Sequence, residues 1–212
     1  MLFRHPWPHP TKDELRRMAK LLVIDDQEFE YKALFEEEGY TVVKWDDAPN
    51  LQRLETSEFH VVLLDLKGIG RNFSSSEGAG LIDHIRETNP AQIIIAYTNA
   101  RHNFAHQHFL DKADYRIPKS EDFSVFKRRV DESLERRFSE DFYFTRLSEV
   151  LTAPGYELSA SLRRKAAKAI RTRNSEGFRQ GLKKLNIDAQ TIDRALTVCS
   201  IASNVLLLVG VH

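Results

Sequence analysis

Short apolar runs alternate with amphipathic segments through most of the chain. The runs lie at residues 20–25, 41–45, 60–65, 92–97 and 115–117. Each run is mostly continuous rather than alternating, as expected for strands that are covered on both faces. Alternation of such runs with helical segments predicts right-handed βαβ units. The pattern therefore predicts an α/β fold with a doubly wound, five-stranded parallel sheet.

The segments between the runs carry helical periodicity. Thr11 and Glu14 form a capping-box pattern, which predicts a short helix before the first strand. Apolar residues at helical spacing predict further helices at 27–38, 78–88 and 121–137.

Strand patterns stop after about residue 140. Segments 142–151, 161–171, 175–185 and 191 onward have helical patterns separated by turn residues. We therefore predict an N-terminal arm and short helix at 1–19, an α/β domain at 20–138 and a small all-α domain at 139–212.

Charge and cysteine content narrow the class of protein. Residues 1–144 carry 20 basic and 26 acidic side chains, whereas residues 145–212 carry 11 and 5, so the second half is basic. Cys199 is the single cysteine and lies in an apolar stretch, which favours a small core residue and excludes a disulfide within the chain. The N-terminus has no apolar signal region. These features predict a cytoplasmic protein.

Polar side chains stand where the predicted strands end. Asp25 and Asp26 follow the first run, Asp65 ends the third, Thr98 follows the fourth and Lys119 follows the fifth. The carboxyl ends of parallel strands meet at one edge of the sheet, where ligands of open α/β sheets bind. Three carboxylates, a hydroxyl and an ammonium at one edge predict a site for phosphoryl transfer.

This ordered set resembles the receiver domain of bacterial two-component response regulators. The resemblance covers residues 20–138 and implies a flavodoxin-like sheet. It rests on Ile24-Asp25-Asp26, Leu64-Asp65-Leu66, Tyr97-Thr98-Asn99, Pro118-Lys119, the segment from Gly78 to Arg86, and Ala113-Asp114.

The resemblance implies a phosphoacceptor and a metal. Asp65 would accept the phosphoryl group as an acyl phosphate. Mg²⁺ would be bound by Asp26, Asp65 and the backbone carbonyl of Lys67, with Asp25 acting directly or through water. Crowded carboxylates repel one another, and a hard divalent cation neutralises them.

The resemblance also implies a switch and partners. Thr98 and Lys119 would contact phosphoryl oxygens, and Tyr115 and Arg116 stand near the place where the family commonly has an aromatic switch residue. The donor would be a histidine kinase or a phosphotransfer protein. The chain would accept a phosphoryl group without being an enzyme in the usual sense, and its helical domain would serve output or oligomerisation, including a homodimer.

A rival hypothesis accounts for the same residues without phosphoryl transfer. Acidic residues after a buried strand also cap helices, and the loop at 66–77 is longer than the family's connection and lacks its proline. In addition, Pro118 precedes the lysine where the family has a proline after it. A phosphorylation-independent adaptor that uses the receiver fold for protein contacts is therefore the rival hypothesis.

The helical domain has two further notable features. The apolar segment at 195–211 is shorter than the roughly 20 residues of a membrane span, so we expect a buried helix or a subunit contact. Outside the helical domain, His102 and His106 have a spacing that can hold zinc, but no further ligand completes that motif. A cluster of basic residues makes DNA binding an alternative that we do not favour, because no helix-turn-helix pattern is present: Arg163, Arg164, Lys165, Lys168, Arg171, Arg173, Arg179, Lys183 and Lys184.

Overall fold

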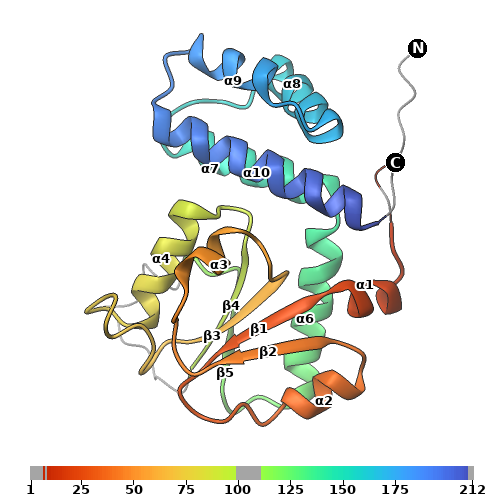
Figure 1. Ribbon diagram of the computed structural model, residues 1–212, viewed down its shortest axis with the longest axis vertical. Coiled ribbons are helices and arrows are strands. Elements are labelled where there is room, and N and C mark those ends of the chain that lie inside the picture. Colours follow the sequence, from red (N-terminus) through yellow and green to blue (C-terminus); the bar gives the residue numbers. More distant parts are fainter. Residues whose placement is uncertain (1–6, 8, 99–110, 210–212) are drawn as a thin grey trace. The chain divides into compact units, whose positions relative to one another are not determined.

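The computed structural model describes residues 7, 9–98 and 111–209 (Figure 1). The chain divides into two compact units. One comprises residues 11–137 and is called the sheet unit below. The other, the helical unit, comprises residues 1–10 and 138–212.

The sheet unit is built on a five-stranded, all-parallel sheet with the order β2-β1-β3-β4-β5. This is the flavodoxin-like order of doubly wound folds, so the predicted fold class is confirmed. Each strand begins and ends within one residue of its predicted position. The strands are β1 (Lys20–Ile24), β2 (Thr41–Trp45), β3 (Val61–Asp65), β4 (Ile93–Thr98) and β5 (Tyr115–Pro118).

Both faces of the sheet are buried, which explains why its apolar runs are continuous. Successive side chains of a strand point to opposite faces, so residues two apart share a face. One face forms the main core with helices α3 (Leu51–Glu55) and α4 (Gly78–Thr88). Its members include Leu22, Ile24, Val62, Leu64, Ile94, Leu81, Ile82 and Ile85.

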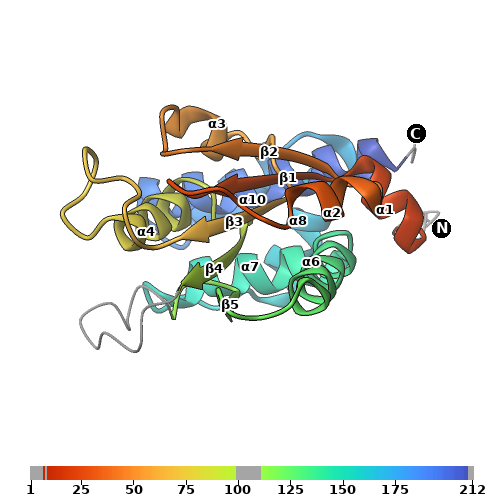
Figure 2. The same ribbon diagram turned by 90° about the horizontal axis from the view of Figure 1, so that it is seen from below.

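Helices flank the sheet on both sides. In Figures 1 and 2, α3 and α4 lie on one side and α1, α2 and α6 on the other. The capping box of Thr11 and Glu14 forms as predicted at the start of α1. The helices are α1 (Lys12–Met18), α2 (Lys32–Glu37), α3 (Leu51–Glu55), α4 (Gly78–Thr88) and α6 (Phe123–Arg137).

The helix expected at 27–38 is shorter than predicted, because α2 begins only at Lys32. The carboxylate of Asp25 accepts a hydrogen bond from the backbone N–H of Gln27, which turns the chain after β1. Such a local bond from an aspartate competes with helix formation. The segment 25–31 is therefore a loop, and it places Phe29 in the protein interior.

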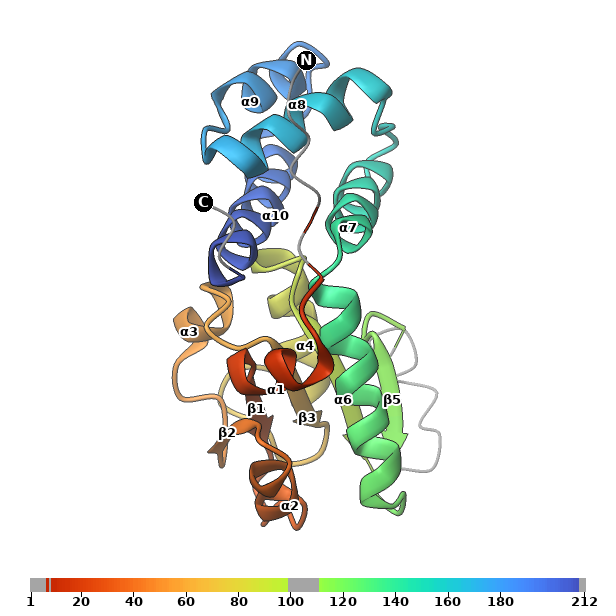
Figure 3. The same cartoon turned by 90° about the vertical axis from the view of Figure 1, so that its right-hand side faces the viewer.

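The helical unit consists of helices in the part of it that the structure describes (Figure 3). They are α7 (Glu140–Thr152), α8 (Ala160–Thr172), α9 (Glu176–Lys183) and α10 (Ala189–Leu208). Side chains of Ser139, Ser159 and Asp188 cap three of them. Trp7, in the N-terminal arm, joins this unit: its indole N–H donates to the Phe138 carbonyl at 2.6 Å, and its ring lies 5.7 Å from that of Tyr143.

By length and composition alone, α10 would suffice to cross a membrane. Half of its most apolar window is buried inside the structure. Cys199 is buried there, and the hydroxyl of Ser203 donates to the carbonyl of Ile170 in α8 at 2.8 Å. These contacts place one face of α10 in the core of the helical unit.

Candidate functional site

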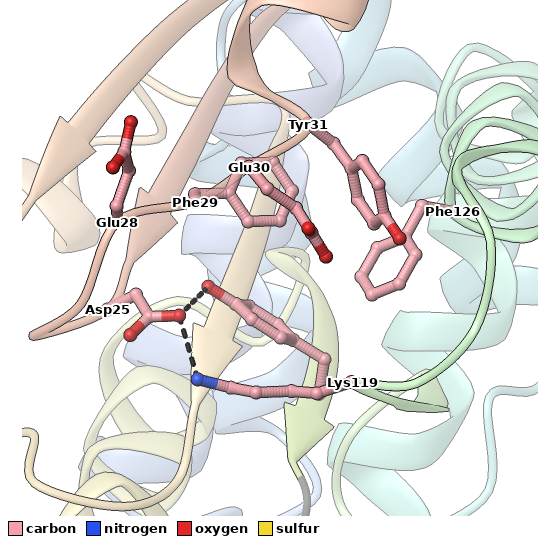
Figure 4. Close-up of a pocket in the computed structure, with 8 residues that line it drawn as sticks. Asp25, Glu28, Phe29, Glu30, Tyr31, Lys119 and Phe126 are labelled. Carbon is pink, nitrogen blue, oxygen red and sulfur yellow. Dashed lines mark hydrogen bonds and ion pairs between the residues drawn. The ribbon is translucent and has the colours of Figure 1, made fainter.

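The carboxyl ends of β1, β3 and β5 bring Asp25, Asp65 and Lys119 together. Nζ of Lys119 lies 2.7 Å from Oδ2 of Asp65 and 2.9 Å from Oδ2 of Asp25 (Figure 4 shows the second pair). Both carboxyl side chains are buried, at 3% and 5% exposure. The convergence predicted from the strand ends is thus present, across 94 residues of sequence.

Asp26 completes a group of three carboxylates with Asp25 and Asp65. One oxygen from each of them lies within 4.8 Å of the others. Gly68 packs against Asp26 so closely that a Cβ at Gly68 would lie 2.3 Å from Oδ2 of Asp26. Three close carboxylates against a single ammonium leave a net negative charge, and hard oxygen donors are the ligands that Mg²⁺ prefers. The donor set therefore fits the predicted metal.

Tyr97 is a site residue that the sequence interpretation did not identify. Its hydroxyl donates to Oδ2 of Asp25 at 2.8 Å, and its ring centroid lies 5.2 Å from Nζ of Lys119. Tyr97 lies opposite Asp65 in the register of β3 and β4, so the two side chains share a face of the sheet. Strand register was the signal that would have revealed it.

Burial and charge shift the titration of this group in definite directions. Burial raises the pKa of Asp65, and the hydrogen bonds from Lys119 and from the backbone of Lys67 offset this only in part. For Lys119, burial lowers the pKa, but hydrogen bonds to Asp65 and Asp25 outweigh it, so the pKa is raised. Burial and the charge of Asp25 raise the pKa of Tyr97. The ammonium form of Lys119 and the protonated hydroxyl of Tyr97 are therefore the stable forms near neutral pH.

The long loop after β3 is ordered by acidic side chains. Oε2 of Glu77 accepts the backbone N–H of Gly68 at 2.8 Å, and Oε1 of Glu77 pairs with Nε of Arg71 at 3.1 Å. Oδ1 of Asp47 accepts the N–H of Gly70 at 2.6 Å. The bonds of Glu77 fold the loop back on itself, and the bond to Asp47 ties it to the segment after β2.

The other predicted site residues lie nearby. The backbone N–H of Lys67 donates to Oδ1 of Asp65 at 3.3 Å, which puts Lys67 directly beside the carboxylate. The carbonyl of Thr98 accepts the backbone N–H of Lys119 at 3.3 Å, linking the ends of β4 and β5. Thr98 pairs with Pro118 in the sheet register, so this proline is part of β5.

Tyr115 and Arg116 lie on β5, outside the acidic group. The guanidinium of Arg129 lies 5.2 Å from the ring centroid of Tyr115, which is half-buried. Arg116 is exposed and pairs with Asp111. Their role in coupling stays a prediction. His102 and His106 lie outside the described residues.

The basic residues of the predicted cluster divide into two groups. Arg163 and Arg171 pair with acidic residues of α7, and Arg179 pairs with Asp193 of α10. The others have no acidic partner in the described parts of the chain: Arg164, Lys165, Lys168, Arg173, Lys183 and Lys184. Part of the predicted cluster is thus structural, and part is a solvated basic surface.

Comparisons with known proteins give the following picture. No protein-family model matches the chain, and no curated protein sequence is similar to it. Solved structures similar to it are response-regulator receiver domains.

The beryllofluoride-activated receiver domain dimer of NtrC4 is 23% identical, with 56% of this chain and 98% of that chain covered and a TM-score of 0.48. A CheY-like receiver domain protein from Methanospirillum hungatei is 24% identical, with 56% and 95% covered and a TM-score of 0.48. TrrA from Thermotoga maritima, in complex with Mg²⁺ and BeF, is 23% identical, with 54% and 98% covered and a TM-score of 0.46. The flavodoxin-like strand order and the geometry of the acidic group stand independently of these similarities.

Proposed function

We propose that the chain is a phosphoacceptor response regulator of a two-component phosphorelay, with Asp65 as the acceptor. One observation carries the proposal: Asp65 is a buried carboxylate held by Lys119 and surrounded by Asp25 and Asp26 at the carboxyl ends of the strands. A structural ion pair needs one carboxylate beside the lysine. Three carboxylates at this edge of the sheet repel one another. A cationic ligand would offset this repulsion, which explains why the three are placed together.

The residues of the site have distinct tasks in this proposal. An oxygen of Asp65 attacks phosphorus, the P–N bond of a donor phosphohistidine breaks, and the donor imidazole leaves with the bonding electron pair. Lys119 then pairs with a phosphoryl oxygen in place of the Asp65 oxygen that it now holds at 2.7 Å. The hydroxyl of Thr98 supplies a second hydrogen bond to the phosphoryl group.

Mg²⁺ completes the proposed site, held by Asp26, Asp65 and the carbonyl of Lys67, with Asp25 bound directly or through water. When bound, it lowers the repulsion between the anionic donor and the carboxylates. Gly68 supports this assignment, because the absence of a Cβ lets Asp26 keep its place in the group.

Partners and output follow from the same proposal. The donor is a histidine kinase or a phosphotransfer protein, and the protein acts in the cytoplasm. The helical unit serves output or self-association rather than DNA binding. Binding of a DNA duplex by the full chain that weakens steeply with salt would contradict the last point, because phosphate contacts release counterions.

Acetyl phosphate or beryllofluoride with Mg²⁺ tests the central claim. We expect an adduct by intact-mass or ¹⁹F measurement in the wild-type chain and none in Asp65→Asn. The matched control is Asp83→Asn, which removes a carboxylate from α4 that pairs with Lys112; it retains the adduct. If the wild-type chain forms no adduct, the adaptor hypothesis replaces this proposal, whereas an adduct that persists in Asp65→Asn would contradict Asp65 as the acceptor.

A further inference from the structure

A pocket of about 230 Å³ opens beside the acidic group, on the face of the sheet that carries Tyr97 (Figure 4). Its walls come from the loop after β1, from β4, from α6 and from Lys119. The lining residues are Asp25, Glu28, Phe29, Glu30, Tyr31, Tyr97, Lys119 and Phe126. None of the tasks assigned to the acidic group uses Glu28, Glu30 or Tyr31.

Aromatic rings form the apolar part of the pocket. Phe29 lies at its centre, with ring centroids 5.8 Å from Tyr31, 5.7 Å from Tyr97 and 6.1 Å from Phe126. Tyr31 and Phe126 are 5.2 Å apart. These mutual contacts fix the rings in place, so the pocket is pre-formed.

Carboxylates form its polar part. Glu28 and Glu30 are exposed at the rim, and Glu28 has no ion-pair partner in the described part of the chain. The hydroxyl of Tyr31 donates to the Glu121 carbonyl at 2.9 Å, and it also interacts with the carboxylate of Glu30. A ligand therefore meets acceptors rather than donors at this rim.

The one cation of the lining is already neutralised. Lys119 pairs with both Asp25 and Asp65. Even with a divalent metal on the three aspartates, the charges of that group and of Lys119 cancel, and Glu28 and Glu30 still leave the pocket negative. A negative pocket with aromatic walls attracts an organic cation and repels an anion.

The structure contains an internal example of this chemistry. Nζ of Lys119 lies 5.2 Å from the ring centroid of Tyr97 while it pairs with Asp25, so a cation here contacts an aromatic ring and a carboxylate together. In Figure 4, Glu30 lies beside Phe29 and Tyr31, which repeats the combination of carboxylate and ring at the rim.

We propose that this pocket binds a guanidinium group, as carried by an arginine side chain. A guanidinium is planar, stacks on aromatic rings, presents a fork of donors to carboxylates and is weakly hydrated. An ammonium is more strongly hydrated and stacks less well. The proposal does not depend on phosphoryl transfer, because Glu28, Glu30 and the aromatic rings have no task in it; Asp25 and Lys119 belong to both sites.

Chemical-shift titration of the full chain tests it, with acetyl-arginine amide as the probe and acetyl-citrulline amide as its neutral isostere. We expect saturable shifts of the residues around Phe29 with the arginine compound, and at least tenfold weaker binding of the citrulline compound. High salt should weaken binding of the arginine compound, because exposed charges are screened.

Substitutions distinguish binding in this pocket from attraction by negative charge elsewhere on the surface. The double variant Glu28→Gln with Glu30→Gln is expected to weaken binding at least fivefold. The matched control, Glu36→Gln with Glu37→Gln, removes the same charge from exposed positions of α2 outside the pocket lining and leaves affinity unchanged. Equal binding of citrulline, or equal affinity in the Glu28 and Glu30 variant, would overturn the proposal.

Two further experiments identify the source of the guanidinium group and separate the result from the test of the proposed function. A peptide with a single arginine that binds at least tenfold more tightly than the amide assigns the guanidinium to a partner protein, whereas equal affinity assigns it to a small molecule. The same titrations in Asp65→Asn give the same ranking, because Asp65 does not line the pocket. Loss of all arginine binding in that variant would contradict the proposed pocket without affecting the test of phosphorylation.

Discussion

At the residue scale, the acidic group depends on a glycine as well as on its carboxylates. Gly68 has φ +86°, and an added Cβ would lie 2.3 Å from Oδ2 of Asp26. We predict that Gly68→Ala displaces Asp26 and raises the dissociation constant of Mg²⁺ about tenfold, equivalent to about 1.4 kcal/mol. Calorimetric titration of the variant with Mg²⁺ measures this.

The chain offers a matched control for that substitution. Gly39 has φ +92°, and an added Cβ there would meet nothing within 4 Å. Both alanine variants lose about 1–2 kcal/mol of stability, because a left-handed conformation is unfavourable for residues with a Cβ. Only Gly68→Ala is expected to lose metal affinity. Similar affinity loss in Gly39→Ala would show that strain, rather than the contact with Asp26, causes the effect.

A buried histidine at the opposite end of the strands sets a dependence on pH. His60 is 6% exposed, and its Nδ1 accepts the backbone N–H of Lys20 at 3.0 Å. Burial first, and then the charges of Arg137 and Lys20, lower the pKa of His60 from 6.5 to about 3. Between these two pH values the unfolded chain binds a proton that the folded chain does not, so the free energy of unfolding falls as pH decreases.

We predict that His60 lowers the free energy of unfolding of the sheet unit by about 1.4 kcal/mol per pH unit below 6.5, down to about pH 3, with no effect above 6.5. Urea unfolding of wild type and His60→Asn at pH 7 and pH 5 measures the difference. The asparagine variant should lose less stability between the two pH values, although it is less stable at pH 7. An equal loss in both proteins would rule out His60 as the source.

The site residues differ in how visible they are in the sequence. Asp25, Asp65 and Lys119 follow apolar runs, so the end of each strand predicted them. Tyr97 sits inside such a run and looks like one more buried residue. Its hydroxyl donates to Asp25, which lies 72 residues away in the sequence, and no local pattern predicts such a contact. Gly68 likewise lies in the long loop at 66–77, where no local pattern marks it as a neighbour of Asp26.

At the element scale, the loop at 66–77 is held by Glu77 on the side facing the acidic group. Oε2 of Glu77 accepts the N–H of Gly68, while Oε1 pairs with Arg71. We predict that Glu77→Ala releases Gly68, increases hydrogen exchange of the loop amides and weakens Mg²⁺ binding about threefold to tenfold. The reason is that Gly68 supports Asp26, so loss of the loop's anchor also loosens a proposed ligand.

Arg71→Ala is the control for the loop, because it removes the ion pair and leaves the bond from Gly68 to Glu77. An exposed ion pair contributes about 0–1 kcal/mol, so this variant should keep its metal affinity and its slow exchange. If Arg71→Ala and Glu77→Ala have equal effects, the ion pair rather than the Gly68 bond orders the loop.

Elements were predictable from the sequence where burial alone determines them. The strands have continuous apolar runs because both faces of the sheet are covered, and their alternation with helical segments predicts a parallel sheet. The start of α2 was mispredicted because a single hydrogen bond, from Gln27 N–H to Asp25, decides it. Helical periodicity reports which face of a segment is buried and carries no information on where a side chain turns the backbone.

At the scale of the whole molecule, the two units have separate cores. Among the residues that the structure describes, the buried members of the main core of the sheet unit run from Leu22 to Ala96, and none comes from the helical unit. The helical unit has its own core, to which the N-terminal arm contributes Trp7 at 7% exposure. The helical unit comprises residues 1–10 and 138–212, so the sheet unit lies between its two parts in the sequence.

The two tryptophans make this division measurable, since Trp7 belongs to the helical unit and Trp45 to the sheet unit. In Trp7→Phe the fluorescence reports the sheet unit, and in Trp45→Phe it reports the helical unit. We predict that Mg²⁺ at 100 times its dissociation constant raises the free energy of unfolding of the sheet unit by about 2.7 kcal/mol, because it binds only the folded state.

The transition seen through Trp7 should not move, because the proposed ligands all lie in the sheet unit. Asp65→Asn with Asp26→Asn, in the Trp7→Phe background, should abolish the shift seen through Trp45. If Mg²⁺ moved both transitions equally, the two units would unfold as one cooperative block, and binding at the acidic group would be transmitted to the helices.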